Sequence, residues 1–313
     1  MGKKRLLTGL QPSGQIHIGN YFSAIKPIAD MYKDYETFLM VVDYHALTTL
    51  QDGPKMRQNI FDIVRDYVAS GVDPDDVVLF KQSDVPEHTE LAWIFNSLVT
   101  VAMMMLGHSY KDKVANGKEA NVALFEYPIL MAADILLYDT DIVPVGEDNR
   151  QNIEYAREIV SKFNNAFGQT FRPPAEMIPK TVGMVPGTDG RKMSKSYGNV
   201  VPAFGTRDEI QKAVMSIVTD SSGGVPANVY AIHKLYKTEL ELAPLYEEYK
   251  GKYKALKEAL IEDIDSYIGP MRAKRESITD DDVKKILREG AKKARVIASA
   301  KMTDVRQKIG VAL

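Results

Sequence analysis

Two loops that lie far apart in the chain carry side chains suited to binding phosphate. The first, GLQPSGQIHIGN at residues 9–20, follows an expected strand at 4–8 and precedes an expected helix at 21–32. Its glycines let a ligand approach the backbone closely, and the free N–H groups of a helix start favour an anion. His17 and Asn20 stand at that helix start and can donate hydrogen bonds to phosphoryl oxygens. Taken alone, the loop is equally compatible with an ordinary strand-to-helix turn.

The second loop, GRKMSKS at residues 190–196, has Lys192 and Lys195 on either side of Ser194. Nearby glycines permit such a loop to close over a ligand and to reopen. Positive charge placed on separating phosphates is a large catalytic contribution in a site that excludes water. Two phosphate-directed loops in one chain favour a nucleotide site over two unrelated turns.

A carboxylate stands in the middle of an apolar helix expected at residues 125–138. Tyr127, Met131, Asp134 and Tyr138 are spaced so that they share one face of this helix. A half-buried acid there needs a donor. The residues alone leave two interpretations open: a salt bridge with a Lys or Arg, or a substrate N–H such as that of an indole, which donates and cannot accept. In the second case, Met131 and Tyr127 would form a soft, flat wall for an aromatic ring.

The elements around these residues alternate between strands and helices, which predicts an α/β fold with a doubly wound parallel sheet. Further strands are expected at residues 38–42, 77–80 and 141–145, with helices at 56–71, 89–105 and 151–163. Short polar runs follow these three strands, at 43–46, 81–83 and 146–149. Open α/β sheets bind ligands at the carboxyl ends of their strands, so we expect the site at this edge.

From residue 207 onward, all expected elements are helices, at 208–218, 228–238, 243–267 and 279–308. We place a boundary near residues 197–207, which gives a catalytic unit at 1–200 and an all-helical unit at 201–313. Within the longer helices, Leu256, Leu260, Ile264 and Ile268 form an apolar stripe typical of a core.

The composition excludes several classes of protein. With 45% hydrophobic and 26% charged residues, the 313-residue chain fits an ordinary globular protein. A formal net charge of -2 argues against coating nucleic acid by bulk charge. The chain has no cysteine, which excludes disulfides, thiolate metal sites and a cysteine nucleophile. No apolar run reaches the length of a membrane span, and the first expected strand leaves no room for a signal peptide, so we expect a cytoplasmic location.

Both loops together resemble the paired motifs of the class I aminoacyl-tRNA synthetases. The second motif, KMSKS at 192–196, matches completely, while the first, HIGN at 17–20, ends in Asn20 where many members have a second His. That Asn, preceded by QPSG at 11–14, is similar to the tryptophanyl branch, and the similarity runs the length of the chain. The string YPILMAAD at 127–134 resembles the tryptophan-binding helix of that branch, whereas a tyrosyl relative would more typically have a Gln near Met131.

The resemblance implies activation of L-tryptophan with ATP and transfer to tRNA(Trp), by a homodimer whose helical unit contacts the anticodon and whose last helix can return to the first unit. Mg²⁺ is implied with ATP, and no dedicated protein ligands for a metal are expected. Catalysis would depend on His17, Asn20, Lys192 and Lys195. Tryptophan would be bound by Asp134, Tyr127 and Met131. ATP would be bound by Gln11, Pro12, Ser13, Gly19, Asn20, Gly146, Glu147, Asp148, Val185, Lys192, Met193, Ser194, Lys195 and Ser196.

Three alternatives remain at this point. A tyrosyl-tRNA synthetase is the nearest, and the residues around 131 weigh against it. A small-molecule adenylyltransferase shares the His-x-Gly turn but would not need the long helical unit. A non-catalytic tRNA-binding paralogue would have no reason to keep both phosphate loops. The sequence also leaves open whether Lys111 and Lys113 bind the phosphates or belong to a solvated loop. It leaves the role of Asn149 open too.

Overall fold

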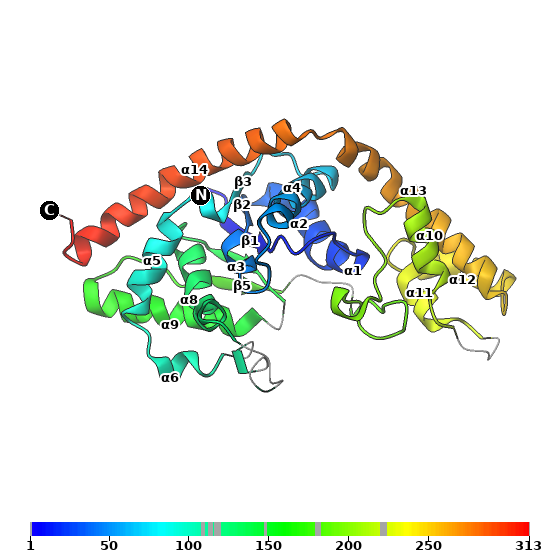
Figure 1. Ribbon diagram of the computed structural model, residues 1–313, viewed down its shortest axis with the longest axis horizontal. Helices are drawn as coiled ribbons and strands as arrows, with labels where there is room; N and C mark the ends of the chain where they lie inside the picture. The colour runs from blue at the N-terminus through cyan, green and yellow to red at the C-terminus, as the bar shows by residue number, and fades with distance from the viewer. Residues whose placement is uncertain are drawn as a thin grey trace.

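The structure is a computed structural model that describes residues 2–107, 110, 111, 115, 120–146, 149–178, 183–219 and 224–312. A five-stranded parallel sheet forms its centre (Figure 1). In spatial order the strands are β3 (Val78–Lys81), β2 (Glu36–Val41), β1 (Arg5–Leu10), β4 (Ile142–Pro144) and β5 (Ala175–Met177). Because the first strand is central and the chain winds outward in both directions, the predicted doubly wound sheet is confirmed.

Side chains on successive residues of each strand enter opposite cores. The helices of this part of the chain are α1 (Ile18–Asn20), α2 (Lys26–Met31), α3 (Asp43–Ala46), α4 (Gly53–Ala69), α5 (Glu87–Asn96), α6 (Val101–Met104), α8 (Val122–Leu136) and α9 (Arg150–Phe167). Leu6 joins the cluster on the face covered by α2 and α4, whereas Leu7 joins the cluster on the face covered by α5, α8 and α9.

Three predicted helices are not single regular α-helices in the structure. The helix expected at 243–267 is wrong as a single element, because residues 249–252 separate α12 (Glu239–Glu248) from α13 (Tyr253–Ser277). The helix expected at 89–105 is wrong as a single element: α5 ends at Asn96, and α6 begins anew after Thr100, whose side chain accepts from Met103 N at 3.3 Å. The helix expected at 21–32 contains a π-helical turn, Tyr21–Ile25, before α2. Pro27 lacks the N–H that would close the α-helical pattern there, which favours the wider turn.

The remaining helices follow the last strand. They are α10 (Arg207–Met215), α11 (Ala227–His233), α12 (Glu239–Glu248), α13 (Tyr253–Ser277) and α14 (Asp280–Lys308). The stripe from Leu256 to Ile268 is buried on α13, as a core face should be. Figure 1 shows α14 leaving the other C-terminal helices and running back across the sheet, where it packs against β3. A boundary between residues 200 and 201 stays a prediction, since α14 lies in space with the first unit.

Gly290 explains how closely α14 approaches the sheet. A Cβ at this position would lie 1.8 Å from Leu79 O, in the middle of β3. Only a residue without a side chain lets the helix backbone come this near to a strand carbonyl. No helix in the described part of the chain has the length and apolar character needed to cross a membrane.

Candidate active site

The carboxyl ends of the strands open into a cavity of about 1000 Å³. Residues from both loops, from α8 and from the end of β4 line it together, although they are spread over most of the chain. Of the predicted site residues, the cavity lining includes Gln11, His17, Gly19, Asn20, Tyr127, Met131, Asp134, Gly146, Val185, Lys192, Met193 and Ser194.

The other predicted ATP residues stand beside the lining or outside the described part. Lys195 Nζ donates to Ser13 O at 3.1 Å and to Gly14 O at 2.9 Å, so its ammonium is docked on the first loop. Pro12 O accepts a hydrogen bond from Asn59 of α4 at 2.8 Å. Ser196 N lies 3.3 Å from Ser194 Oγ. Glu147, Asp148 and Lys113 lie outside the described residues, and Lys111 is exposed.

His17 caps the N-terminus of α1. Its Nδ1 accepts from Asn20 N at 3.2 Å, which leaves the proton on Nε2 and makes that atom a donor. Burial, and then the charge of Lys195, lowers the pKa of His17 to about 4. The imidazole is therefore neutral at neutral pH. A Cβ on Gly19 would lie 3.0 Å from His17 Nδ1, so the glycine makes room for the ring.

Backbone bonds fasten the first loop to the segment that follows the second. Ile18 N donates to Val201 O at 3.0 Å, and Ala203 N donates to Ile16 O at 3.0 Å. These bonds fix the distance between the two phosphate-directed loops. The sequence contained no signal for this pairing, because it joins irregular segments.

Asn199 shapes the second loop. Its Nδ2 donates to Asp189 Oδ1 at 2.7 Å and to Lys192 O at 3.1 Å, while its Oδ1 accepts from Ser194 N at 2.8 Å. The side chain is buried, and a Cβ on Gly187 would collide with it at 2.2 Å. One amide thus holds Lys192 in a defined backbone conformation. Sequence reasoning missed Asn199.

Asp134 is buried on α8 and already has donors. His45 Nε2 lies 2.8 Å from Oδ2, and Gln82 Nε2 lies 2.9 Å from both carboxylate oxygens. His88 Nδ1 lies 2.6 Å from Oδ1, in a contact that is not aligned as a hydrogen bond. Burial raises the pKa of Asp134, but His88 and His45 outweigh it and lower the pKa to about 2. Asp134 is therefore ionised beside the cavity.

Among the described residues, Asp134 forms no salt bridge with a Lys or Arg, which was one of the two interpretations that the sequence left open. Its partners are two imidazoles and an amide, brought from the carboxyl end of β2 and from the segment after β3. The sequence indicated His45 and Gln82 as polar residues at strand ends, but not their pairing with Asp134. His88 was missed. Its Nε2 lies 2.8 Å from Tyr138 OH, which ties it back to the end of α8.

Tyr127 and Met131 form an apolar wall next to this carboxylate. The two residues are one helical turn apart on α8, with Tyr127 OH 3.8 Å from Met131 Sδ. The Tyr127 ring stands edge-on to the His45 ring, with 4.7 Å between centroids. A flat aromatic ligand entering here would meet a sulfur, a phenol ring and a carboxylate together. Within the described ranges, no group of three or more His, Asp or Glu residues is placed to hold a metal ion.

Comparison with known proteins gives concordant similarities. A family model described as "tRNA synthetases class I (W and Y)" matches residues 2–286. The chain is 43% identical to a tryptophan–tRNA ligase of Fusobacterium nucleatum, with 98% of each chain covered. It is 40% identical to a tryptophan–tRNA ligase of Rhodopirellula baltica, over 98% of this chain and 99% of the relative.

Solved structures give the same result. The crystal structure of tryptophanyl-tRNA synthetase from Campylobacter jejuni, complexed with ADP and tryptophan, superposes with a TM-score of 0.92 at 42% identity. The alignment covers 98% of this chain and 99% of that one. The tyrosyl-tRNA synthetase of Archaeoglobus fulgidus, at 18% identity and a TM-score of 0.67, shares the fold.

Proposed function

The chain belongs to the class I tRNA synthetases for tryptophan and tyrosine, and we propose that it acts as a tryptophan–tRNA ligase. It activates L-tryptophan with ATP to tryptophanyl-adenylate and transfers the aminoacyl group to tRNA(Trp). One observation carries this proposal: a single cavity joins a buried, ionised Asp134 to both phosphate-directed loops.

The reaction needs positioning and charge rather than a covalent nucleophile. The tryptophan carboxylate attacks the α-phosphorus of ATP, the bond to the bridging oxygen breaks, and pyrophosphate leaves with the bonding electron pair. His17 Nε2–H and the Asn20 amide stand at the helix start of the first loop and donate hydrogen bonds to phosphoryl oxygens. Lys192 and Lys195 supply positive charge to the β- and γ-phosphates, where negative charge accumulates. For this role Lys195 must exchange its carbonyl partners for phosphate oxygens.

Asp134 recognises the indole. Gln82 makes both of its contacts with Asp134 through one amide nitrogen. An indole N–H that enters from the cavity therefore competes with only some of the donors that already contact the carboxylate. The depressed pKa keeps the carboxylate an acceptor at neutral pH. Met131 and Tyr127 cover the ring. A tyrosine side chain cannot present a ring N–H at this place, which supports tryptophan over tyrosine.

The remaining ATP contacts follow the family resemblance. Gly146, Glu147 and Asp148 serve the ribose and its neighbouring backbone, and Val185 presents backbone groups to the adenine. Gln11, Pro12, Ser13, Gly19, Met193, Ser194 and Ser196 complete the nucleotide site. Mg²⁺ is expected with ATP, where it would neutralise phosphate charge, and no dedicated protein ligands are assigned to it.

The protein also acts as a homodimer, which an apolar surface supports. The exposed fractions are 78% for Trp93 on α5, 66% for Val101 on α6 and 69% for Val122 at the start of α8. Met105 and Leu106, just after α6, are also more than half exposed. Large apolar side chains exposed on several elements favour an interaction site. The proposed partner on this surface is a second copy of the chain. We place the protein in the cytoplasm. Residues 201–313 are the part proposed to contact the tRNA anticodon.

A charging assay tests the function. Purified protein is incubated with ATP, labelled tryptophan or labelled tyrosine, and tRNA, and the label attached to tRNA is counted. We expect tryptophan alone to be attached. Attachment of tyrosine would favour the tyrosyl enzyme. Adenylate without attachment would favour an adenylyltransferase, and the absence of both products would favour a non-catalytic paralogue.

A further inference from the structure

Each oxygen of the Asp134 carboxylate is contacted by an imidazole. His45 Nε2 lies 2.8 Å from Oδ2, and His88 Nδ1 lies 2.6 Å from Oδ1. Gln82 Nε2 reaches both oxygens at 2.9 Å. The carboxylate is therefore held on both sides, which restricts its rotation about the bond to Cβ. His88 has no role so far in the proposed function: it is fully buried and does not line the cavity.

The contacts of His88 assign the proton to one of its ring nitrogens. At 2.6 Å, a nitrogen lone pair and a carboxylate oxygen would repel each other, so Nδ1 must carry a hydrogen even though the contact is not aligned as a hydrogen bond. The other nitrogen, Nε2, lies 2.8 Å from Tyr138 OH. Burial, and then the charge of Asp134, raise the pKa of Tyr138, so its hydroxyl keeps its proton and can donate to Nε2. This arrangement is the Nδ1–H form of the neutral ring.

Tyr138 is a rigid anchor for the His88 ring. It lies just after the end of α8, on which Asp134 stands, and is fully buried. Its ring packs against Phe38 and Phe80, with 5.1 Å and 5.6 Å between centroids. Within the described part of the chain, its hydroxyl makes one hydrogen bond, to His88 Nε2. The phenol therefore holds the imidazole at the nitrogen that is remote from the carboxylate.

We propose that His88, held by the Tyr138 hydroxyl, is a positioning residue for Asp134, and that the pair determines how the carboxylate faces the indole N–H. The inference rests on the proposed function, because it takes the indole as the ligand of Asp134. Neither residue of the pair lines the cavity, so both act through the carboxylate. Their effect should therefore be specific to a ligand with a ring N–H and absent for a ligand without one.

The first test compares Tyr138→Phe with Tyr67→Phe. Both remove one hydroxyl from a fully buried tyrosine, but the Tyr67 hydroxyl has no hydrogen-bond partner among the described residues. KM for tryptophan is measured by ATP–pyrophosphate exchange. Benzothienylalanine, a tryptophan analogue with sulfur in place of the indole N–H, is measured as a competitive inhibitor.

We expect Tyr138→Phe to raise KM for tryptophan about fivefold and to leave the inhibition constant of benzothienylalanine unchanged. Tyr67→Phe should change neither value by more than about twofold. Equal weakening of both ligands by Tyr138→Phe would show a general loss of structure and would overturn the proposal. An unchanged KM for tryptophan in Tyr138→Phe would also overturn it.

Variants of His88 test whether Tyr138 acts through this ring. His88→Asn keeps an N–H donor near the position of Nδ1, whereas His88→Leu removes it. We expect KM for tryptophan to rise about tenfold in His88→Leu and less than about threefold in His88→Asn. Tyr138→Phe should have no further effect in the His88→Asn background. An equal rise in the two His88 variants, or an undiminished effect of Tyr138→Phe in that background, would overturn the proposal.

The protonation of the ring can be measured in the wild-type protein. NMR of protein labelled with ¹⁵N-histidine should show a protonated Nδ1 and an unprotonated Nε2 for His88, whose signals are assigned by their loss in His88→Asn. The opposite pattern would overturn the proposal. If the His88 variants do not fold, this spectrum, assigned by the shift of the His88 signals in Tyr138→Phe, and the tyrosine comparison decide.

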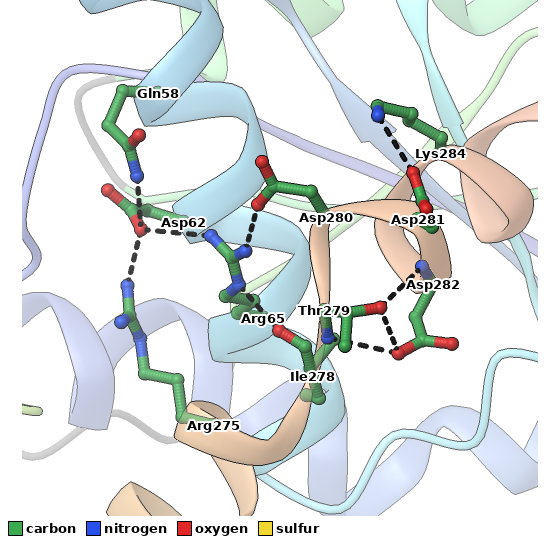
Figure 2. A network of polar contacts seen from close by, with 10 residues as sticks. All are labelled: Gln58, Asp62, Arg65, Arg275, Ile278, Thr279, Asp280, Asp281, Asp282 and Lys284. Atoms are coloured by element: carbon green, nitrogen blue, oxygen red, sulfur yellow. Dashed lines mark hydrogen bonds and ion pairs between the residues drawn. The ribbon is translucent and has the colours of Figure 1, made fainter.

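A last variant controls for lost stability. Arg65, on α4, donates to Ile278 O at 3.0 Å and pairs with Asp280 at the junction of α13 and α14 (Figure 2). None of the residues labelled in Figure 2 lines the cavity. Arg65→Gln should lower stability and leave KM for tryptophan within about twofold of the wild-type value. A rise equal to that in Tyr138→Phe would overturn the proposal, whereas absence of tryptophan-dependent exchange in the wild-type protein would instead contradict the proposed function.

Discussion

His45 Nε2 and Asp134 Oδ2 meet at 2.8 Å, and both side chains are buried at the edge of the cavity. His45 follows β2 directly, whereas Asp134 lies on α8, 89 residues later in the chain. The contact orients the carboxylate, and Tyr127 and Met131 line the same cavity. We therefore expect this strand-end histidine to determine how the proposed tryptophan pocket presents its acceptor.

His45→Ala should weaken tryptophan binding more than ATP binding. Removal of the imidazole leaves Asp134 with fewer donors and lets it rotate, so we expect KM for tryptophan to rise about tenfold with KM for ATP unchanged. His233→Ala is the control. This equally buried histidine, 2.7 Å from Asp263 on the distant α13, is a similar pair away from the cavity. An equal rise of KM in both variants would show a general structural effect.

The His17 imidazole should remain neutral throughout the physiological range. Its pKa is lowered from 6.5 to about 4 in the folded protein, so between these values the unfolded chain binds more protons. The associated stability is present above pH 6.5 and decreases as the pH falls toward 4. NMR titration of the His17 ring should give a midpoint near 4, and His17→Gln should flatten the stability profile in this window. A midpoint near 6.5 would contradict the burial argument.

Lys192→Ala should reduce the chemical step rather than tryptophan binding. Lys192 lines the cavity, and loss of one preorganised charge at a reacting oxyanion costs about 100-fold in kcat. Arg191→Ala is the matched control, because the neighbouring cation is exposed and paired with Asp189 at 2.6 Å. We expect less than about a twofold change in the control. Single-turnover formation of the adenylate distinguishes the chemical step from product release.

Gly290→Ala should destabilise the fold through the contact of α14 with β3. The added methyl would lie 1.8 Å from Leu79 O, and a strand carbonyl cannot move away, so the loss should be about 3 kcal/mol. Ala300→Ser, on the exposed face of the same helix, should change stability by less than about 0.5 kcal/mol. Denaturant unfolding measures both. A normal stability for Gly290→Ala would contradict the close packing of α14 on the sheet.

Trp93 allows a direct test of the proposed dimer. It is the single tryptophan of the chain and is 78% exposed in the isolated chain. Trp93→Asp places a charge in the apolar surface and should shift sedimentation from dimer to monomer. In the unaltered protein, the Trp93 fluorescence maximum should move to longer wavelength on dilution. A monomer at all concentrations would contradict the proposal.

The sequence predicted the parts of the fold that depend on local pattern. Continuous apolar runs became parallel strands, and the two loops met at the expected edge of the sheet. The break at Thr100 was missed because the residues on both sides are apolar and continue a helical pattern. A capping Thr ahead of that apolar segment was the available signal. The π-helical turn before Pro27 was missed for a similar reason, since periodicity does not distinguish helix types.

The partners of Asp134 could not be derived from the sequence in the same way. A buried acid in the sequence indicates that hydrogen-bond donors must lie near it. Its neighbours, however, come from strand ends and helices whose placement depends on the whole sheet. His45 and Gln82 were indicated only as polar residues at the correct edge. His88 carries no local signal, because a single histidine on a helix is ordinarily a core residue. Asn199 holds the second loop largely through backbone atoms of Lys192 and Ser194, and side-chain patterns do not encode such contacts.

The most direct test of the central claim is ATP–pyrophosphate exchange with tryptophan, tyrosine and phenylalanine, each measured with the wild-type protein and with Asp134→Asn. We expect exchange with tryptophan, at least about 1000-fold lower kcat/KM with the other two, and loss of this preference in the variant. Exchange driven by tyrosine in the wild-type protein, or full tryptophan preference in Asp134→Asn, would contradict the assignment of the buried carboxylate to the indole.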